Sequence, residues 1–188
     1  MSRDSGYLGP LHETWALEAS NAARAWGCAV GDSLTRVAII DQGIRATGFA
    51  DLVPNVDTVV DGNQPGEAFL HGTNVAHVLA ARGDNGGQMS GMMWRGRMTL
   101  YDASQRDSTT GLLRFPQGPN PNPVPLLEGQ KFVDALIAAA NSGARVINIS
   151  LGNGDSTLLN LPPTPAYDAS LRAMIGLLVY NERTHAQG

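Results

Sequence analysis

Short apolar runs alternate with helix-like segments along most of this chain, and that alternation limits the folds it can adopt. Strands are predicted at residues 36–40, 56–60, 98–101, 146–149 and 177–180. Helices are predicted at residues 17–26, 72–82, 132–140 and 167–175. Strands separated by helices pair in parallel through crossover connections, which cover both faces of a sheet. We therefore predict an α/β fold with a doubly wound, mostly parallel sheet and helices on both faces.

The charge balance argues against a nucleic-acid partner. The formal net charge is -4 and the pI is about 5.4, whereas binding to phosphates needs clustered basic residues. No apolar run approaches the roughly 20 residues that cross a bilayer, so no membrane partner is expected. The single Cys28 excludes an intrachain disulfide.

The N-terminal residues lack the apolar stretch of roughly 7 to 15 residues that marks a secretory leader. This absence favours a cytoplasmic protein over a secreted mature form. A chain whose leader had been removed would show the same pattern, so the compartment stays open.

The 188 residues fit one domain or a large piece of one. We interpret residues 1–14 as an N-terminal extension and residues 115–126 as a Pro-rich loop. Proline removes backbone donors and disfavours helix at the residue before it, which is why this second segment interrupts the alternation.

Two polar residues lie at positions where such a sheet usually has its functional side chains. Asp41 closes the apolar run at residues 37–40, and His71 opens a predicted helix thirty residues later. Ligands of open α/β sheets collect at the carboxyl ends of strands. A carboxylate followed by a histidine supplies two parts of a serine-peptidase triad, in which the imidazole takes the serine proton and the carboxylate fixes the tautomer. Either residue alone would more simply be a turn cap or a structural side chain.

A third segment, at residues 148–152, ends a predicted buried strand with small residues. Exposed amides and carbonyls at such a strand end can pair with an extended peptide as an added strand. Ser150, Leu151 and Gly152 are therefore predicted to bind a peptide or protein substrate.

Three segments in this order resemble the subtilisin family of serine peptidases. Residues 37–43 (VAIIDQG) are similar to the family's aspartate motif, and residues 71–76 (HGTNVA) are similar to its histidine motif. Residues 146–152 (VINISLG) are similar to the strand that lines the specificity cleft. The resemblance runs from about residue 15 to residue 181, and it implies the N-terminal portion of a subtilisin-like catalytic domain, with an incomplete sheet.

The resemblance also implies roles for individual residues. Asp41 would orient and support His71, and His71 would act as general base and acid. Asn181 is similar to the family's oxyanion asparagine, whose amide donates to the charge that develops on the scissile carbonyl. Tyr180 stands where the family usually has glycine, and a turn asparagine after a strand is the alternative for Asn181.

The nucleophile is the part that the sequence does not provide. No serine lies in a Gly-x-Ser-x-Gly setting or in a Gly-Thr-Ser step ahead of an apolar helix, and the serines at positions 142, 150, 156 and 170 all precede Asn181. One hypothesis is a serine endopeptidase whose serine lies in a missing C-terminal segment or in a partner chain. The alternative is a catalytically inactive pseudoprotease or peptide-binding module that acts with a partner chain.

No cofactor is required for this chemistry, although the resemblance allows a calcium ion. Family members often bind calcium between an aspartate shortly after the first motif and the loop after the histidine helix. Asp51, Asp84 and Asn85 offer hard oxygen ligands at these places.

Overall fold

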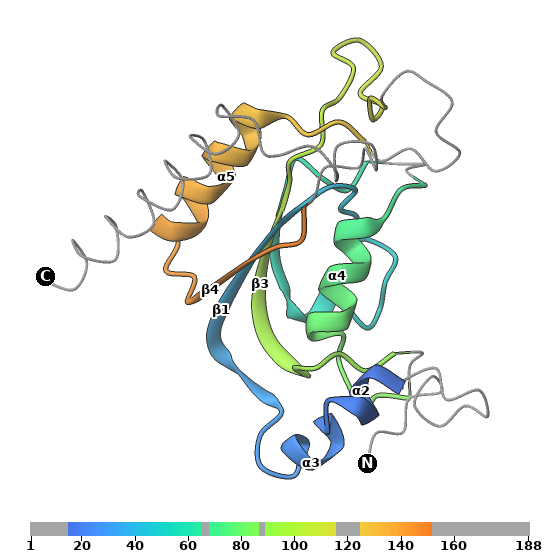
Figure 1. The fold of residues 1–188 in the computed structure, drawn as a ribbon, viewed down its shortest axis with the longest axis vertical. Helices are drawn as coiled ribbons and strands as arrows, with labels where there is room; N and C mark the ends of the chain where they lie inside the picture. The colour runs from blue at the N-terminus through green and yellow to red at the C-terminus, as the bar shows by residue number, and fades with distance from the viewer. Residues whose placement is uncertain (1–14, 65–67, 87–88, 116–124, 152–188) are drawn as a thin grey trace, which may run out of the picture.

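The computed structural model describes residues 15–64, 68–86, 89–115 and 125–151. The elements in chain order, shown in Figure 1, are α2 (Trp15–Ala19), α3 (Ala22–Trp26), β1 (Gly31–Asp41), the short 3-10 helix η1 (Val53–Asn55), β2 (Val56–Val60), α4 (His71–Ala80), β3 (Arg95–Asp102), α5 (Gly129–Asn141) and β4 (Val146–Ile149). These elements confirm the alternation predicted for the described part of the chain.

The four strands form one parallel sheet in the order β2-β3-β1-β4. Strand β1 lies inside the sheet, with Ile39 paired to Leu100 of β3 on one side and to Asn148 of β4 on the other. The connection through α4 leads from β2 to β3, and the connection through α5 carries the chain from β3 past β1 to β4. This arrangement confirms the predicted parallel α/β fold.

The two longer helices cover opposite faces of the sheet, as Figure 1 shows. Alternate residues of β1 point to opposite faces. Val37 and Ile39 pack in one cluster with Ala76 and Ala80 of α4. Ala38 and Ile40 pack in the second cluster with α5, which contributes Phe132, Ala135, Leu136 and Ala139. The sheet is thus buried on both sides, which explains why β1 has a continuous apolar run and not a polar-apolar alternation.

The first predicted helix is wrong in one respect, because the structure divides it into α2 and α3. Asn21 adopts a left-handed conformation with φ 61°, which a continuous helix does not allow. The hydroxyl of Ser20 donates to the carbonyl of Leu17 at 3.1 Å, a local bond that competes with helical pairing. Strand β1 also starts earlier than predicted, at Gly31. Its first half is exposed and pairs irregularly with β3, so it lacks the apolar run from which the strand was predicted.

Several predicted features lie outside the described residues. They are residues 1–14, most of the Pro-rich loop (116–124), the helix at 167–175 and the strand at 177–180. Within the described part, no helix combines the length and the apolar character needed to cross a bilayer.

Candidate active site

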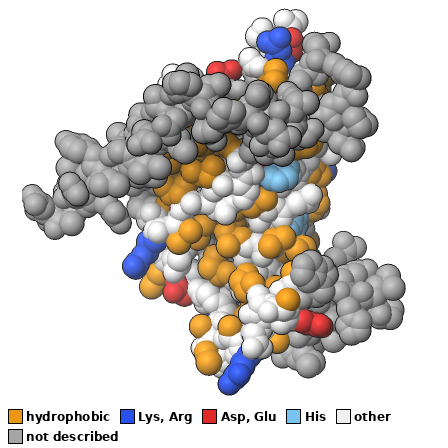
Figure 2. All heavy atoms as spheres, viewed as in Figure 1, with side chains coloured by type: hydrophobic (Ala, Val, Ile, Leu, Met, Phe, Trp, Pro, Cys, Tyr) orange, Lys and Arg blue, Asp and Glu red, His pale blue; other side chains and the backbone are white. Residues whose placement is uncertain are grey.

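Asp41 and His71 meet at the carboxyl end of β1. Asp41 is the last residue of β1 and is fully buried, while His71 is the first residue of α4 with a side chain 48% exposed. His71 Nδ1 lies 2.7 Å from Asp41 Oδ1, which also accepts the backbone N–H of Gln42 at 2.7 Å. Because Nδ1 faces the carboxylate, Nε2 is the ring nitrogen left to exchange a proton with another molecule or side chain. In Figure 2, histidine side chains (pale blue) lie at the molecular surface over α4.

The turn after β1 brings the two side chains together by accepting hydrogen bonds from the start of α4. The first N–H groups of a helix have no partner within the helix. Here the N–H of Gly72 donates to the carbonyl of Gln42 at 2.8 Å, and the N–H of Thr73 donates to the carbonyl of Gly43 at 3.3 Å. The helix therefore begins against this turn, which places its first side chain, His71, beside the last side chain of β1.

Two glycines make this close approach feasible. A Cβ on Gly72 would lie 2.8 Å from Asp41 Cβ and 2.6 Å from a side-chain carbon of Ile44. Gly43 has φ 67°, and a Cβ there would lie 2.4 Å from the carbonyl oxygen of Phe69. Any larger residue at either position would push the helix away from the strand end.

Burial governs the electrostatics of the carboxylate. Removal from water raises the pKa of Asp41 above its ordinary value, while the hydrogen bonds from His71 and from the Gln42 N–H oppose the rise. The charge of nearby Asp102 raises the pKa of Asp41 further. The ionised form of Asp41 thus depends on its hydrogen-bond donors, of which His71 contributes most.

The predicted substrate-binding strand ends at the same edge of the sheet. Ile40 pairs with Ile149, so Ser150 follows β4 just as Asp41 follows the apolar run of β1. Ser150 is exposed, and its hydroxyl accepts a hydrogen bond from Asn148 Nδ2 at 2.9 Å. Leu151 packs against the α5 cluster. Gly152 and Asn181 lie outside the described residues.

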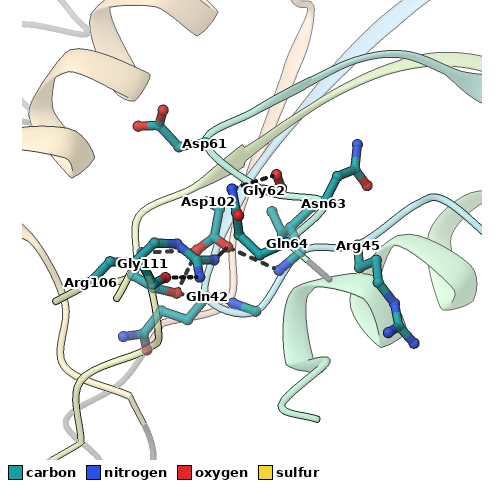
Figure 3. A network of polar contacts seen from close by, with 12 residues as sticks. Gln42, Arg45, Asp61, Gly62, Asn63, Gln64, Asp102, Arg106 and Gly111 are labelled. Carbon is teal, nitrogen blue, oxygen red and sulfur yellow. Dashed lines mark hydrogen bonds and ion pairs between the residues drawn. The ribbon is translucent and has the colours of Figure 1, made fainter. Parts of the chain in front are cut away.

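A buried polar network beside Asp41 was not predicted. Asp102 is the last residue of β3, directly opposite Asp41, and it forms an ion pair with Arg106 at 2.6 Å. Figure 3 shows Arg106 and Asp102 pointing toward each other, close to Gln42. The sequence does contain a sign of this network, because Asp102 follows the apolar run at residues 98–101 as Asp41 follows its own.

The three residues considered for calcium lie in two neighbouring loops. Asn85 Nδ2 donates to Asp51 Oδ1 at 2.9 Å, and the N–H of Arg82 donates to the carbonyl of Asp51 at 2.7 Å. Asp84 precedes Asn85 in a left-handed conformation with φ 56°. Among the described residues, no group of three His, Cys, Asp or Glu side chains converges. A cation here would thus bind at most the two carboxylates of Asp51 and Asp84, together with amide and carbonyl oxygens.

A hollow of about 610 Å³ lies against α4, away from the Asp41–His71 pair. Phe49, His77 and Met89 are among the residues that line it. His77 Nδ1 lies 2.9 Å from the carbonyl oxygen of Thr73. Because a carbonyl oxygen can only accept a hydrogen bond, Nδ1 carries the proton and donates it. His77 is therefore held within its own helix, and its role here is packing against Phe49, with ring centroids 5.0 Å apart.

Comparison with known proteins decides the family. A sequence model of the subtilase family matches residues 32–173, about three quarters of the chain, including Asp41, His71 and the strand before Ser150. The chain belongs to the subtilase family.

Two relatives are proteases of bacilli. A thermophilic serine proteinase of Bacillus sp. (strain AK1) is 32% identical over 132 residues, which cover 68% of this chain and 28% of that protein. A cell wall-associated protease of Bacillus subtilis (strain 168) is 32% identical over 130 residues, which cover 64% of this chain and 12% of that protein. The subtilase chain thus spans less than a third of each of these relatives.

The raised pKa of Asp41 gives a signed pH dependence of stability. Between the ordinary value of 3.8 and its folded pKa, Asp41 binds more protons in the folded state than in the unfolded state, so rising pH lowers the free energy of unfolding. Asp41→Asn removes this cost. We expect the unfolding free energy of Asp41→Asn, minus that of the wild type, to increase as the pH rises above 3.8 and then to level off. Urea titrations at a series of pH values measure the difference.

Asp107→Asn provides a control of opposite sign. Backbone N–H groups of Thr110 and Thr109 lower the pKa of Asp107, so its contribution is present above the ordinary value and is lost as the pH falls through the lowered pKa. The same difference for Asp107→Asn should decrease with rising pH. A flat or falling difference for Asp41→Asn would contradict the account of its burial.

Proposed function

We propose that this subtilase chain provides the acid–base pair of a serine endopeptidase of the subtilisin type. The observation that supports this proposal is the 2.7 Å contact between Asp41 and His71 at the carboxyl end of a parallel sheet. In the proposed reaction, His71 Nε2 takes the proton of a serine hydroxyl as the oxygen attacks the peptide carbonyl, and returns it to the leaving amine. Asp41 holds Nδ1 protonated and stabilises the imidazolium that forms.

The serine itself is proposed to come from outside these 188 residues. No serine of the chain has the sequence setting of a nucleophile. We place it in a continuation of the polypeptide or in a partner chain, so that its hydroxyl reaches His71 Nε2. In the same proposal, Ser150, Leu151 and Gly152 pair with an extended peptide, and Asn181 donates to the oxyanion.

The test is covalent labelling. Joined to a segment that carries a Gly-Thr-Ser step, the chain is expected to react with a peptidyl phosphonate specific for activated serines. His71→Ala should lower the labelling rate roughly 10³-fold or more, because the hydroxyl loses its base. His77→Ala is the matched control on the same helix, since His77 bonds to Thr73 and not to Asp41, and should label at nearly the wild-type rate. Equal labelling of the two variants would contradict the assigned role of His71.

A peptide-binding module without catalysis is the second candidate. It is supported by the position of β4 at the edge of the described sheet, with Ile149 and Ser150 exposed where an added strand could pair. This candidate requires that extended peptides bind equally well to the wild type and to His71→Ala, with no phosphonate labelling of the joined protein. Turnover of a peptide amide would exclude it.

We further propose a calcium site between Asp51 and the loop at Asp84 and Asn85. The oxygen ligands offered are the carboxylates of Asp51 and Asp84 and the side-chain carbonyl of Asn85, in two loops that the hydrogen bond from Asn85 Nδ2 to Asp51 Oδ1 at 2.9 Å holds together. Equilibrium dialysis is expected to detect binding at about millimolar calcium, weakened by Asp51→Asn. Asp57→Asn is the control, because Asp57 is exposed and pairs with Arg97 elsewhere. Absence of binding at millimolar calcium would reject the site.

A further inference from the structure

The turn after Asp41 is held by β3 as well as by α4. Asp102 lies opposite Asp41 in the register of β1 and β3, and its side chain is fully buried. One carboxylate oxygen, Oδ2, accepts the N–H of Ile44 at 3.3 Å, and the other, Oδ1, accepts the N–H and the hydroxyl of Ser104 at 2.9 and 2.5 Å. A carboxylate can accept all of these bonds, because its two oxygens offer about four acceptor sites.

Ser104 extends this hold to the next residue of the turn. Its hydroxyl donates to Asp102 and accepts the N–H of Gly43 at 3.1 Å. The N–H of Ala103 donates to the carbonyl of Asp41 at 2.8 Å. The end of β3 therefore fixes the backbone of Asp41, Gly43 and Ile44, while the carbonyls of Gln42 and Gly43 accept the first N–H groups of α4.

A second carboxylate next to Asp41 has an electrostatic consequence. The negative charge of Asp102 raises the pKa of Asp41. Arg106 Nη2 lies 2.6 Å from Asp102 Oδ2, with a side chain only 12% exposed, so its positive charge balances that carboxylate at short range. From α4, the charged group that faces Asp41 is His71, and the described residues of β4, Val146–Ile149, carry no charge.

We propose that Asp102 and Arg106 form a positioning pair for Asp41, in which Asp102 fixes the turn at residues 41–44 and Arg106 offsets the charge that Asp102 brings to it. The role rests on the proposed peptidase function, because it assigns the pair to the residue that orients His71. Neither residue contacts the imidazole, so both act through Asp41.

A carboxyl ¹³C NMR titration of Asp41 in the 188-residue chain tests the electrostatic half. Arg106→Gln leaves Asp102 without its counter-charge, so the pKa of Asp41 should shift upward. A purely structural role predicts the opposite, because a loosened site admits water and returns the pKa of Asp41 toward 3.8. Arg114→Gln removes the same charge from an exposed position in the same loop, and should leave the titration unchanged.

The outcomes separate the two roles. An upward shift in Arg106→Gln that is absent in Arg114→Gln supports the pair. A downward shift, or a shift equal to that of Arg114→Gln, overturns it.

Asp102→Asn tests the positioning half. An amide oxygen accepts fewer hydrogen bonds than a carboxylate, and its NH₂ group would face a donor. The amide of Ile44 should therefore exchange with solvent roughly tenfold faster, and the pKa of Asp41 should shift downward. Unchanged exchange at Ile44 would overturn the assignment of Asp102.

The double variant Asp102→Asn/Arg106→Gln covers the case in which a lone buried charge prevents folding, because it removes both charges together. Because the two charges offset each other, its Asp41 pKa should lie between the values of the two single variants and close to that of the wild type, and a shift as large as that of either single variant would overturn the proposal. None of these measurements depends on turnover. Failed phosphonate labelling would thus reject the proposed function alone, and an Asp41 titration that is unchanged in Arg106→Gln, together with successful labelling, would reject this inference alone.

Discussion

A carboxylate removed from water at the end of a strand is the constraint on which the rest of this structure depends. Burial of a charged group is unfavourable unless hydrogen-bond donors compensate for the lost solvent. Asp41 Oδ1 receives them from the Gln42 N–H and from His71, while Oδ2 has no hydrogen-bond partner among the described residues. The fold must therefore keep the start of α4 against the end of β1, and the residues that allow this approach serve the chemistry as well as the packing.

The sheet makes that geometry rigid. Two apolar clusters, one under α4 and one under α5, bury β1 from both faces. Sites built on strands and helices are held more precisely than sites on loops. The turn at residues 41–44 is the less regular part, and it is fixed from two directions, by the N–H groups of α4 and by the polar end of β3. The site is thus a junction of three elements, none of which could hold the pair alone.

The sequence was sufficient for the order of the elements and for the meeting of Asp41 with His71. Buried strands have apolar runs and parallel strands need crossover connections, so the order of the elements follows from local patterns. The meeting of Asp41 with His71 was implied by the resemblance of their two motifs to those of the subtilisin family. The break at Asn21 was missed because a left-handed residue between two short helices leaves the alanine-rich periodicity intact. The Asp102–Arg106 pair was missed for a different reason. An Asp and an Arg four residues apart in the sequence are typical of an exposed ion pair. Only the register of β3 against β1 shows that the Asp102–Arg106 pair is buried beside Asp41. Gly152 and Asn181 remain predictions, since they lie outside the described residues.

The most direct test of the central claim is the tautomer of His71, read from its imidazole ¹⁵N shifts at alkaline pH, where the ring is neutral. The two nitrogens of a neutral imidazole have distinct shifts, one for the protonated and one for the bare position. The account requires that Nδ1 carry the proton and donate it to Asp41, with Nε2 bare, and that Asp41→Asn abolish this preference. A wild-type chain with the proton on Nε2 would contradict it, because the bare nitrogen would then be Nδ1, which faces the Asp41 carboxylate, and Nε2 could not accept a proton from a serine.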